Sequence, residues 1–188
     1  MKDFKHVSKF MSLVLRHKPE EIGLQLDPHG WVSIDELITK LNEKGLKVDL
    51  NIIQHIVINN DKKRFCFNED NTMIRANQGH SIEVDLDLEV VSPPEFLFHG
   101  TAEHAVSIIL EEGLQKRNRH HVHLTANRET AVMVGGRHGK PVVLEVRAME
   151  MEKAGFVFFL SANNVWLVDI VPPGYLNLFN PASHQHLP

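Results

Sequence analysis

The amino-acid sequence predicts an α+β fold of two lobes, the first of them a winged helix. Apolar residues recur at helical spacing in three segments between Phe4 and Val57, and a segment typical of a β-hairpin follows them. Three helices followed by a hairpin form the winged-helix pattern, which is common in nucleic-acid-binding proteins. Strand and helix signals mix after Ser92-Pro93-Pro94, which we interpret as a linker. The pattern alone is equally compatible with an α+β module that binds no ligand.

The elements of the N-terminal lobe, residues 1–92, follow from local signals. A first helix is expected from Phe4 to His17, and Pro19 ends it. A second helix follows Ser33, whose spacing from Glu36 is that of a capping box. Asp49 can cap a third helix. The expected hairpin consists of the strands Arg64–Phe67 and Thr72–Arg75, joined by the turn Asn68–Asn71.

The C-terminal lobe, residues 93–180, is expected to mix strands with helices, and residues 181–188 to form a loose tail. An amphipathic helix containing Ala105 ends at Gly113. The segment Gly135–Gly139 matches neither a P-loop nor the dinucleotide fingerprint, so we interpret it as a mobile turn. The expected strands are Phe96–Phe98 (ending at His99-Gly100-Thr101), His121–Leu124, Pro141–Val146, Phe156–Leu160 and Val165–Val171.

The composition favours a cytoplasmic protein over a secreted, membrane or nucleic-acid-coating one. Hydrophobic residues make up 43% of the 188 residues, and the net charge is −4. The single cysteine, Cys66, excludes an internal disulfide and a cysteine-rich zinc site. No run of 18 apolar residues occurs, and the first ten residues lack an apolar signal core. We therefore expect a cytoplasmic monomer that contacts no membrane.

The charges are distributed unevenly along the chain. Residues 1–80 contain 12 Lys and Arg against 11 Asp and Glu, whereas residues 81–188 contain 8 against 13. The balance is therefore +1 in the first segment and −5 in the second. This difference favours the N-terminal lobe as the surface for a polyanion.

The strongest local signal is the segment Gln115–His123, with the sequence QKRNRHHVH. Arg119, His121 and His123 alternate, so they are expected to project from one face of a strand. One alternative is a polar strand edge without function. Another is a zinc site formed by His121 and His123 with His99, but no acidic ligand follows nearby, and we expect no metal.

Two further basic groups have both structural and functional interpretations. Arg16-His17 lies at the end of the first helix, where the helix dipole favours a cation. Lys62-Lys63-Arg64 precedes a strand, where basic residues commonly form a solvated edge. The planar guanidinium of arginine also matches phosphate oxygens, so this group could instead bind phosphate.

Taken together, several segments resemble one family, the tRNA 2′-phosphotransferases. The similarity runs from about Lys9 to Leu178 and is specific because all the segments occur in order. Thr125 stands where serine is more common, and Lys116 and Arg117 add charge where an apolar residue is common. The segments are Ser12-Leu13-Val14-Leu15-Arg16-His17-Lys18-Pro19, Lys62–Phe65, Ile74-Arg75-Ala76-Asn77-Gln78-Gly79-His80-Ser81, His99-Gly100-Thr101, and Arg119-His120-His121-Val122-His123-Leu124.

The resemblance implies an RNA-binding winged-helix lobe and a second lobe similar to the ADP-ribosyltransferases, which binds NAD. It implies an enzyme that uses NAD as a consumed co-substrate, with no metal, and acts on tRNA-like RNA that carries a 2′-phosphate. The residues it implies for catalysis are Arg16, His17, Arg64 and Arg119. Those it implies for NAD binding are His99, Gly100, Thr101, His121, His123 and Thr125.

The implied reaction removes an internal RNA 2′-phosphate through an ADP-ribosylated RNA intermediate, as in tRNA splicing. The products are RNA with a 2′-hydroxyl, nicotinamide and ADP-ribose 1″,2″-cyclic phosphate. No glutamate occurs between Asn163 and Val168, where many ADP-ribosyltransferases have one. Two alternatives remain: an ADP-ribosyltransferase acting on nucleic-acid ends or protein, and a winged-helix RNA-binding or regulatory protein without catalysis.

Overall fold

A computed structural model describes residues 4–60, 62–137 and 139–179, and the fold is α+β. The chain divides into two compact units, Met1–Leu88 and Glu89–Pro188, each continuous in sequence. The first unit ends at residue 88, whereas the first lobe was predicted to end at residue 92. The predicted tail, residues 181–188, lies outside the described residues. No described helix is both long and apolar enough to cross a membrane.

The helices of the first unit begin at the capping residues that the sequence predicts. The Ser33 hydroxyl accepts from the Glu36 amide at 3.4 Å, and the Asp49 carboxylate accepts from the Ile52 amide at 2.9 Å. The first helix ends at Arg16, one residue before its predicted end, and Pro19 begins a 3₁₀ helix. These elements are α1 (Phe4–Arg16), η1 (Pro19–Ile22), α2 (Ile34–Glu43) and α3 (Leu50–Ile58).

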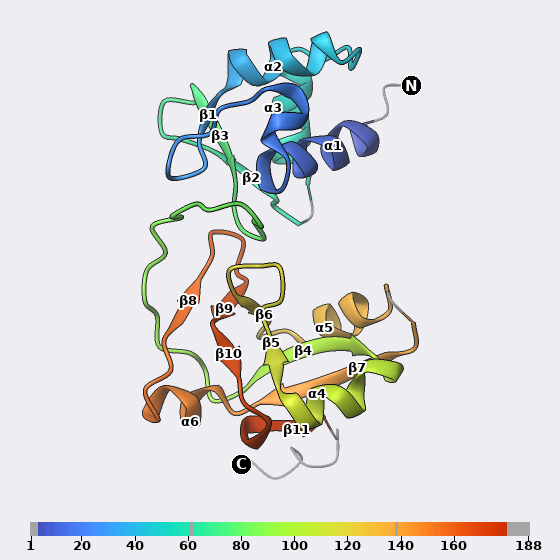
Figure 1. Cartoon of the computed structure of the whole chain (residues 1–188), viewed down its shortest axis with the longest axis vertical. Helices are drawn as coiled ribbons and strands as arrows, with labels where there is room; N and C mark the ends of the chain where they lie inside the picture. Colours follow the sequence, from blue (N-terminus) through green and yellow to red (C-terminus); the bar gives the residue numbers. More distant parts are fainter. Residues whose placement is uncertain (1–3, 61, 138, 180–188) are drawn as a thin grey trace. The chain divides into compact units, whose positions relative to one another are not determined.

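The three helices of this unit pack beside a small antiparallel sheet (Figure 1). The predicted hairpin is confirmed as β2 (Phe65–Phe67) and β3 (Met73–Ala76), and β1 (Val32–Ser33) pairs with the other side of β3. Arg64, predicted as a strand residue, lies just before β2. Its neighbour Lys63 has φ 40°, a left-handed conformation that does not fit a strand. Side chains buried in the core include Met11, Leu15, Leu37, Ile53 and Ile74.

The second unit is built from short antiparallel sheets. Phe98 and Thr125 exchange two backbone hydrogen bonds, of 2.8 and 2.9 Å, which join β4 to the residue after β6. One sheet has the order β11-β7-β4 and another β6-β9-β8, while β10 pairs with β5. The strands are β4 (Leu97–Ala102), β5 (Leu114–Gln115), β6 (Val122–Leu124), β7 (Pro141–Val146), β8 (Phe158–Leu160), β9 (Trp166–Val168), β10 (Ile170–Val171) and β11 (Leu176–Leu178).

Several strand predictions in this unit need correction, and β6 and β8 begin one and two residues after their predicted starts at His121 and Phe156. The first strand does not end before His99-Gly100-Thr101 but continues to Ala102, so this motif lies within β4. The predicted strand Val165–Val171 is interrupted at Asp169, where β9 ends and β10 begins. The strand predicted over Pro141–Val146 is confirmed as β7.

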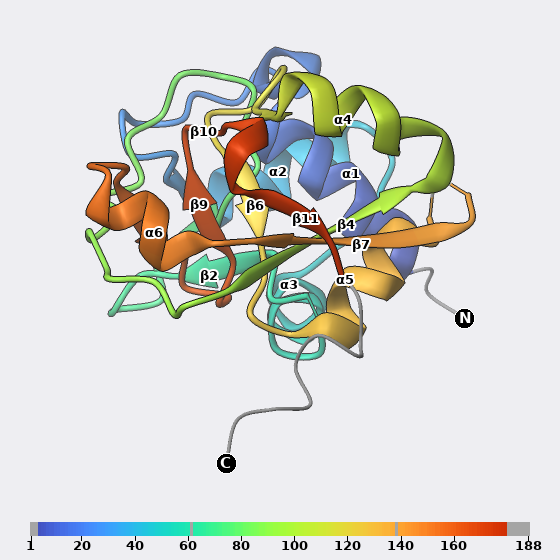
Figure 2. The same cartoon turned by 90° about the horizontal axis from the view of Figure 1, so that it is seen from below.

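Helices α4 and α5 lie on opposite sides of β4 and β7 (Figure 2). The predicted helix ending at Gly113 is confirmed as α4, whereas α5 was not predicted, and Asn127 caps it by accepting from the Thr130 amide at 2.7 Å. A Cβ atom at Gly100 would lie 1.8 Å from the Ala131 carbonyl oxygen, so β4 and α5 meet backbone against backbone. The helices are α4 (Val106–Glu112), α5 (Arg128–Gly135) and α6 (Ala148–Lys153), with the 3₁₀ helices η2 (Glu103–Ala105) and η3 (Pro173–Tyr175).

Candidate active site

Arg16 and His17, at the C-terminal end of α1, are both hydrogen-bonded to Ser81. The Ser81 amide donates to the Arg16 carbonyl at 2.9 Å, and the Ser81 hydroxyl lies 2.9 Å from His17 Nδ1. The hydroxyl can donate or accept, so this contact fits either His17 tautomer. Ser81 therefore fixes the end of the helix and the direction of the imidazole together.

Arg64 is carried by a tight turn that begins at Asn60. The Lys63 amide donates to the Asn60 carbonyl at 2.7 Å, and the Lys62 amide donates to the Asn60 side-chain oxygen at 3.0 Å. The same Asn60 oxygen lies 3.4 Å from Arg64 Nη1, a long and therefore weak hydrogen bond. The residues just before Arg64, Lys62 and Lys63, are therefore held by hydrogen bonds from their backbone amides to Asn60.

The structure joins Arg16 to Arg64 although 48 residues separate them in sequence. Arg16 Nη2 donates to the Arg64 carbonyl oxygen at 3.2 Å, and the Asn77 amide donates to the same oxygen at 2.9 Å. The three predicted catalytic residues of the first unit, Arg16, His17 and Arg64, are therefore held by one connected set of hydrogen bonds. Arginine side chains held in this way offer charged donors, which suit a dianionic ligand such as a phosphate monoester.

In the second unit, His99, Arg119 and His123 come together. His99 Nδ1 lies 3.1 Å from the His123 carbonyl oxygen, and Arg119 Nη1 lies 3.2 Å from His123 Nδ1. A carbonyl oxygen can only accept, so the proton of His99 sits on Nδ1 and its Nε2 is an acceptor. A guanidinium can only donate, so His123 Nδ1 accepts and its Nε2 carries the proton. The two imidazoles thus present opposite hydrogen-bonding groups.

Burial reinforces the neutral state of His99. Loss of hydration lowers the pKa of His99 below the ordinary histidine value, and the nearby charge of Arg119 lowers it further. The hydrogen bond to the His123 carbonyl acts in the opposite direction but is the smaller effect. His99 is therefore a neutral acceptor at neutral pH, suited to a ligand hydroxyl rather than to an anion.

His121 does not join this group, which corrects the prediction that Arg119, His121 and His123 share one strand face. Strand β6 begins at Val122, so Arg119 and His121 lie in the preceding turn. The His121 ring instead packs edge-on against Phe159, with ring centroids 5.4 Å apart. Burial is the main cause that lowers the pKa of His121, and the neighbouring His120 adds to it.

The remaining predicted cofactor residues line the junction of β4 and α5. Gly100 and Thr101 lie in β4, and a Cβ at Gly135 would lie 2.5 Å from the Thr101 carbonyl oxygen. Gly135 is the last residue of α5, whereas the sequence analysis had placed it in a mobile turn. The Thr125 hydroxyl accepts from the Asn127 amide at 3.1 Å, just before α5 begins.

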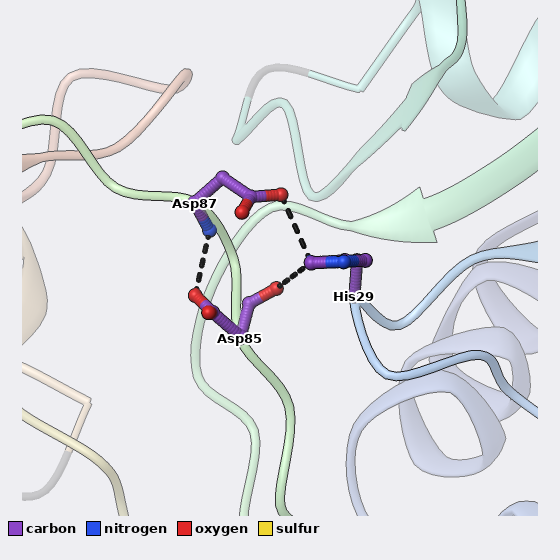
Figure 3. Close-up of side chains that lie close together, drawn as sticks. All are labelled: His29, Asp85 and Asp87. Atoms are coloured by element: carbon purple, nitrogen blue, oxygen red, sulfur yellow. Dashed lines mark hydrogen bonds and ion pairs between the residues drawn. The ribbon is translucent and has the colours of Figure 1, made fainter.

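The metal-binding alternative at the histidines is not supported. Within residues 4–60, 62–137 and 139–179, the ligand atoms of His99, His121 and His123 do not gather as a metal site requires. The group that does gather is His29, Asp85 and Asp87 in the first unit, with ligand atoms within 4.8 Å of one another (Figure 3). There, His29 Nδ1 lies 2.9 Å from the Asp87 carboxylate and 3.0 Å from the Asp85 carbonyl oxygen. In this arrangement the His29 ring proton on Nδ1 is shared with these two oxygens, so hydrogen bonds hold the group together.

Sequence reasoning missed the residues that orient the arginines. Asn77 and Ser81 lie inside the segment Ile74–Ser81, so a signal existed, although neither was assigned a role. Asn60 was assigned no role either, although its oxygen accepts locally from Lys62 and Arg64, and its contact with Ser8 forms only when α1 packs beside it. Lys116 forms an ion pair of 2.5 Å with Asp169, which partly offsets the extra charge noted in the sequence.

Comparisons with known proteins cover nearly the whole chain. Residues 2–170 match the model of a family described as RNA 2′-phosphotransferase, Tpt1/KptA family. A Flavobacterium johnsoniae protein named "Probable RNA 2'-phosphotransferase" is 54% identical over 172 residues, 92% of this chain and 94% of the relative. Proteins of the same name from Trichormus variabilis and Fusobacterium nucleatum are 52% and 50% identical, over 93% and 90% of this chain and 96% of each relative.

Proposed function

This chain belongs to the RNA 2′-phosphotransferase family, and from that premise we propose that it transfers an RNA 2′-phosphate to the ADP-ribose part of NAD. It is a transferase, as its curated relatives at about 50% identity are named. The proposed products are RNA with a 2′-hydroxyl, nicotinamide and ADP-ribose 1″,2″-cyclic phosphate. The proposed substrate is a tRNA-like RNA with an internal 2′-phosphate, as left by tRNA splicing in the cytoplasm.

Each unit has a proposed part in this reaction. The first unit, with three helices and a hairpin, acts as a winged-helix module that binds RNA, and Arg16, His17 and Arg64 receive the 2′-phosphate. The second unit acts as an ADP-ribosyltransferase-like module that binds NAD. The opposed imidazoles of His99 and His123 support this assignment, since a dinucleotide offers both hydroxyl donors and oxygen acceptors.

The observation that carries the proposal is the hydrogen bond from Arg16 to the main chain of Arg64. It links the Arg16 guanidinium to the backbone at Arg64, 48 residues away in sequence, and Arg16 precedes His17 in the chain. A protein that only bound NAD would not need this arrangement. An enzyme that holds a phosphate which first attacks and is then attacked needs arginines at fixed positions, and this bond fixes Arg16 to the backbone at Arg64.

In the first proposed step, an oxygen of the RNA 2′-phosphate attacks the ribose carbon of NAD that carries nicotinamide. The carbon–nitrogen bond breaks, and its electron pair leaves with nicotinamide, which becomes neutral. The nucleophile needs little deprotonation, because the second pKa of a phosphate monoester is about 6. The enzyme's task in this step is therefore alignment, together with charge from arginine that offsets the repulsion between two anions.

In the second proposed step, the adjacent ribose 2″-hydroxyl attacks the phosphorus. The bond from phosphorus to the RNA 2′-oxygen breaks, and that oxygen takes up a proton in exchange for the one that the 2″-hydroxyl loses. We assign His17 the transfer or donation of a proton at the phosphate, since the ordinary histidine pKa is about 6.5. Negative charge builds on the phosphate oxygens, so the guanidiniums of Arg16, Arg64 and Arg119 contribute most here.

The proposal is tested with a short oligoribonucleotide that carries one internal 2′-phosphate. With NAD, we expect loss of the phosphate, equimolar release of nicotinamide and formation of the cyclic phosphate, all followed by chromatography and mass spectrometry. Without NAD, the RNA is expected to stay unchanged. Two control substrates, the same oligonucleotide with a 2′-hydroxyl and one with a terminal phosphate only, separate phosphate removal from ADP-ribosylation of nucleic-acid ends.

Release of inorganic phosphate without NAD would refute the proposed chemistry and indicate a phosphatase. Stable ADP-ribosylation of the terminal phosphate, with the internal 2′-phosphate untouched, would support the ADP-ribosyltransferase alternative instead.

A further inference from the structure

Asn77 is a buried asparagine that follows β3 and holds the turn carrying Arg64. Its side chain is only 7% exposed, and its Nδ2 donates to the Lys63 carbonyl oxygen at 2.6 Å. Its main-chain amide donates to the next carbonyl along, that of Arg64, at 2.9 Å. One residue therefore fixes the direction of two consecutive peptide groups, immediately before and at Arg64.

The peptide that Asn77 holds is strained. Lys63 has φ 40°, in the left-handed region that a residue with a Cβ rarely adopts. Such a conformation persists only where the surroundings impose it, and strained residues of this kind cluster at functional sites. Without the Nδ2 donor, Lys63 is free to relax toward an ordinary conformation, which would swing the following residue, Arg64.

The hydrogen bonds from Asn77 to the Lys63 and Arg64 carbonyls also affect Arg16. The Arg64 carbonyl that Asn77 fixes is the acceptor for Arg16 Nη2, at 3.2 Å. Rotation of this peptide would therefore move the Arg64 side chain and remove the acceptor of Arg16 in one motion. We propose that Asn77 is a positioning residue that sets the spacing of the Arg16 and Arg64 guanidiniums through the Lys63–Arg64 backbone. This inference rests on the proposed function, in which both groups hold the transferred phosphate.

The hydrogen bonds show which half of the amide does this. Among the described residues, the Asn77 Oδ1 atom finds no donor, whereas Nδ2 makes the short bond to Lys63. Asn77→Asp keeps the shape of the side chain but replaces this donor with an oxygen that repels the Lys63 carbonyl. Asn77→Ser keeps a donor on a shorter side chain and should rescue in part.

Asn42 offers a matched control in the same unit. Its Nδ2 donates to the Val48 carbonyl at 2.8 Å, and its Oδ1 accepts from the Val48 amide at 2.9 Å. Asn42→Asp thus removes the same kind of side-chain donor from the same kind of backbone acceptor, in a segment that carries no proposed catalytic residue. Its effect should be confined to thermal stability.

The test is a double-mutant cycle on the full chain, read as the single-turnover rate on the 2′-phosphorylated oligonucleotide with NAD. We expect Asn77→Asp to slow the reaction about 10- to 100-fold, the range set by misplacing a catalytic group. In an Arg64→Ala background the same change should cost clearly less than in the wild type, because only its effect through the acceptor of Arg16 remains. Effects that multiply instead would overturn the inference, as would an equal loss of rate in Asn42→Asp. If Asn77→Asp does not fold, the cycle is run with Asn77→Ser, and full multiplication again overturns the inference.

A second readout separates this inference from the proposed function. If the wild-type chain leaves the 2′-phosphate in place, the proposed function fails. The positioning role of Asn77 is then tested by RNA binding alone. The quantity is then the ratio of Kd values for the oligonucleotide with a 2′-hydroxyl and with a 2′-phosphate. Asn77→Asp should bring this ratio toward one, whereas Asn42→Asp should leave it unchanged. A ratio that Asn77→Asp does not alter, or one already equal to one in the wild type, overturns the inference.

Discussion

Replacing Arg64 by alanine should damage catalysis while leaving the fold nearly intact. The contacts that organise the turn use the Arg64 main-chain oxygen, which accepts from Arg16 Nη2 and from the Asn77 amide and stays in place in the variant. The hydrogen bond from the Arg64 side chain to Asn60 is 3.4 Å long and therefore weak. We therefore expect thermal unfolding of Arg64→Ala to differ from the wild type by less than about 1 kcal/mol.

The catalytic loss should fall mainly on the second step. A charged hydrogen bond to phosphate contributes roughly 1.5–3 kcal/mol, which corresponds to about a 10- to 150-fold change in rate. Charge builds on the phosphate in the second step, whereas the first step mainly needs alignment. ADP-ribosylated RNA should therefore accumulate in Arg64→Ala, and likewise in Arg119→Ala. Lysine at either position should rescue only in part, because it keeps the charge but loses the planar pair of donors.

A time course on end-labelled RNA would show the intermediate as a more slowly migrating species, with nicotinamide release measured in the same samples. Nicotinamide should appear in a burst ahead of the RNA product in both alanine variants. If nicotinamide and product instead appear together at a reduced rate, with no intermediate, the arginines serve substrate binding rather than transfer of the phosphate.

Three further predictions concern the second unit and the co-substrate. A chelator should leave activity intact and omission of NAD should abolish it; activity lost to chelator and restored by zinc would revive a metal site. The lowered pKa of His99 keeps its ring neutral, so the KM for NAD should stay flat from pH 8 down to the ordinary histidine value of about 6.5 and rise only below it. Stability should fall over the same range, because the unfolded chain takes up the proton first. A rise in KM centred above pH 7 would contradict this. Gly100→Ala should lower the free energy of unfolding by at least about 1–3 kcal/mol in urea titrations, because its Cβ would lie 1.8 Å from a carbonyl oxygen. Gly174→Ala, with nothing within 4 Å of its added Cβ, is the control, and equal midpoints for the two variants would disprove the close contact.

The elements that the sequence predicted well are those determined by neighbouring residues. Ser33 and Asp49 cap α2 and α3 through side chains three residues from their partners, so the signal lies within a single turn. Helix α5 was missed because its segment, RETAVMVG, has little apolar periodicity and ends in glycine. The strand through His99-Gly100-Thr101 was cut short for a similar reason, since glycine usually ends a strand. Gly100 is tolerated there because α5 approaches its backbone, a tertiary contact that no local pattern reveals.

The candidate site divides in the same way. Arg16, His17, Arg64 and Arg119 could be singled out from motifs, as could His99 and His123. The tautomers of the two histidines could not, because they depend on a carbonyl 24 residues away and on a guanidinium across a turn. The orientation of Arg64 depends on Asn60, which is close in sequence, and on Asn77, which reaches the Lys63 and Arg64 carbonyls only after the hairpin closes.

The continuity of the two units has a consequence for the order of events during synthesis. Every residue that joins Arg16 to Arg64 lies before Leu88, so this part of the site needs nothing that the ribosome makes later. Arg119 lies 119 − 88 = 31 residues beyond Leu88. The ribosome needs about 2–6 s to add these residues. We expect the arginine pair to form on the nascent chain while the second unit is still emerging, so that substitutions slowing the later unit leave the earlier pair intact.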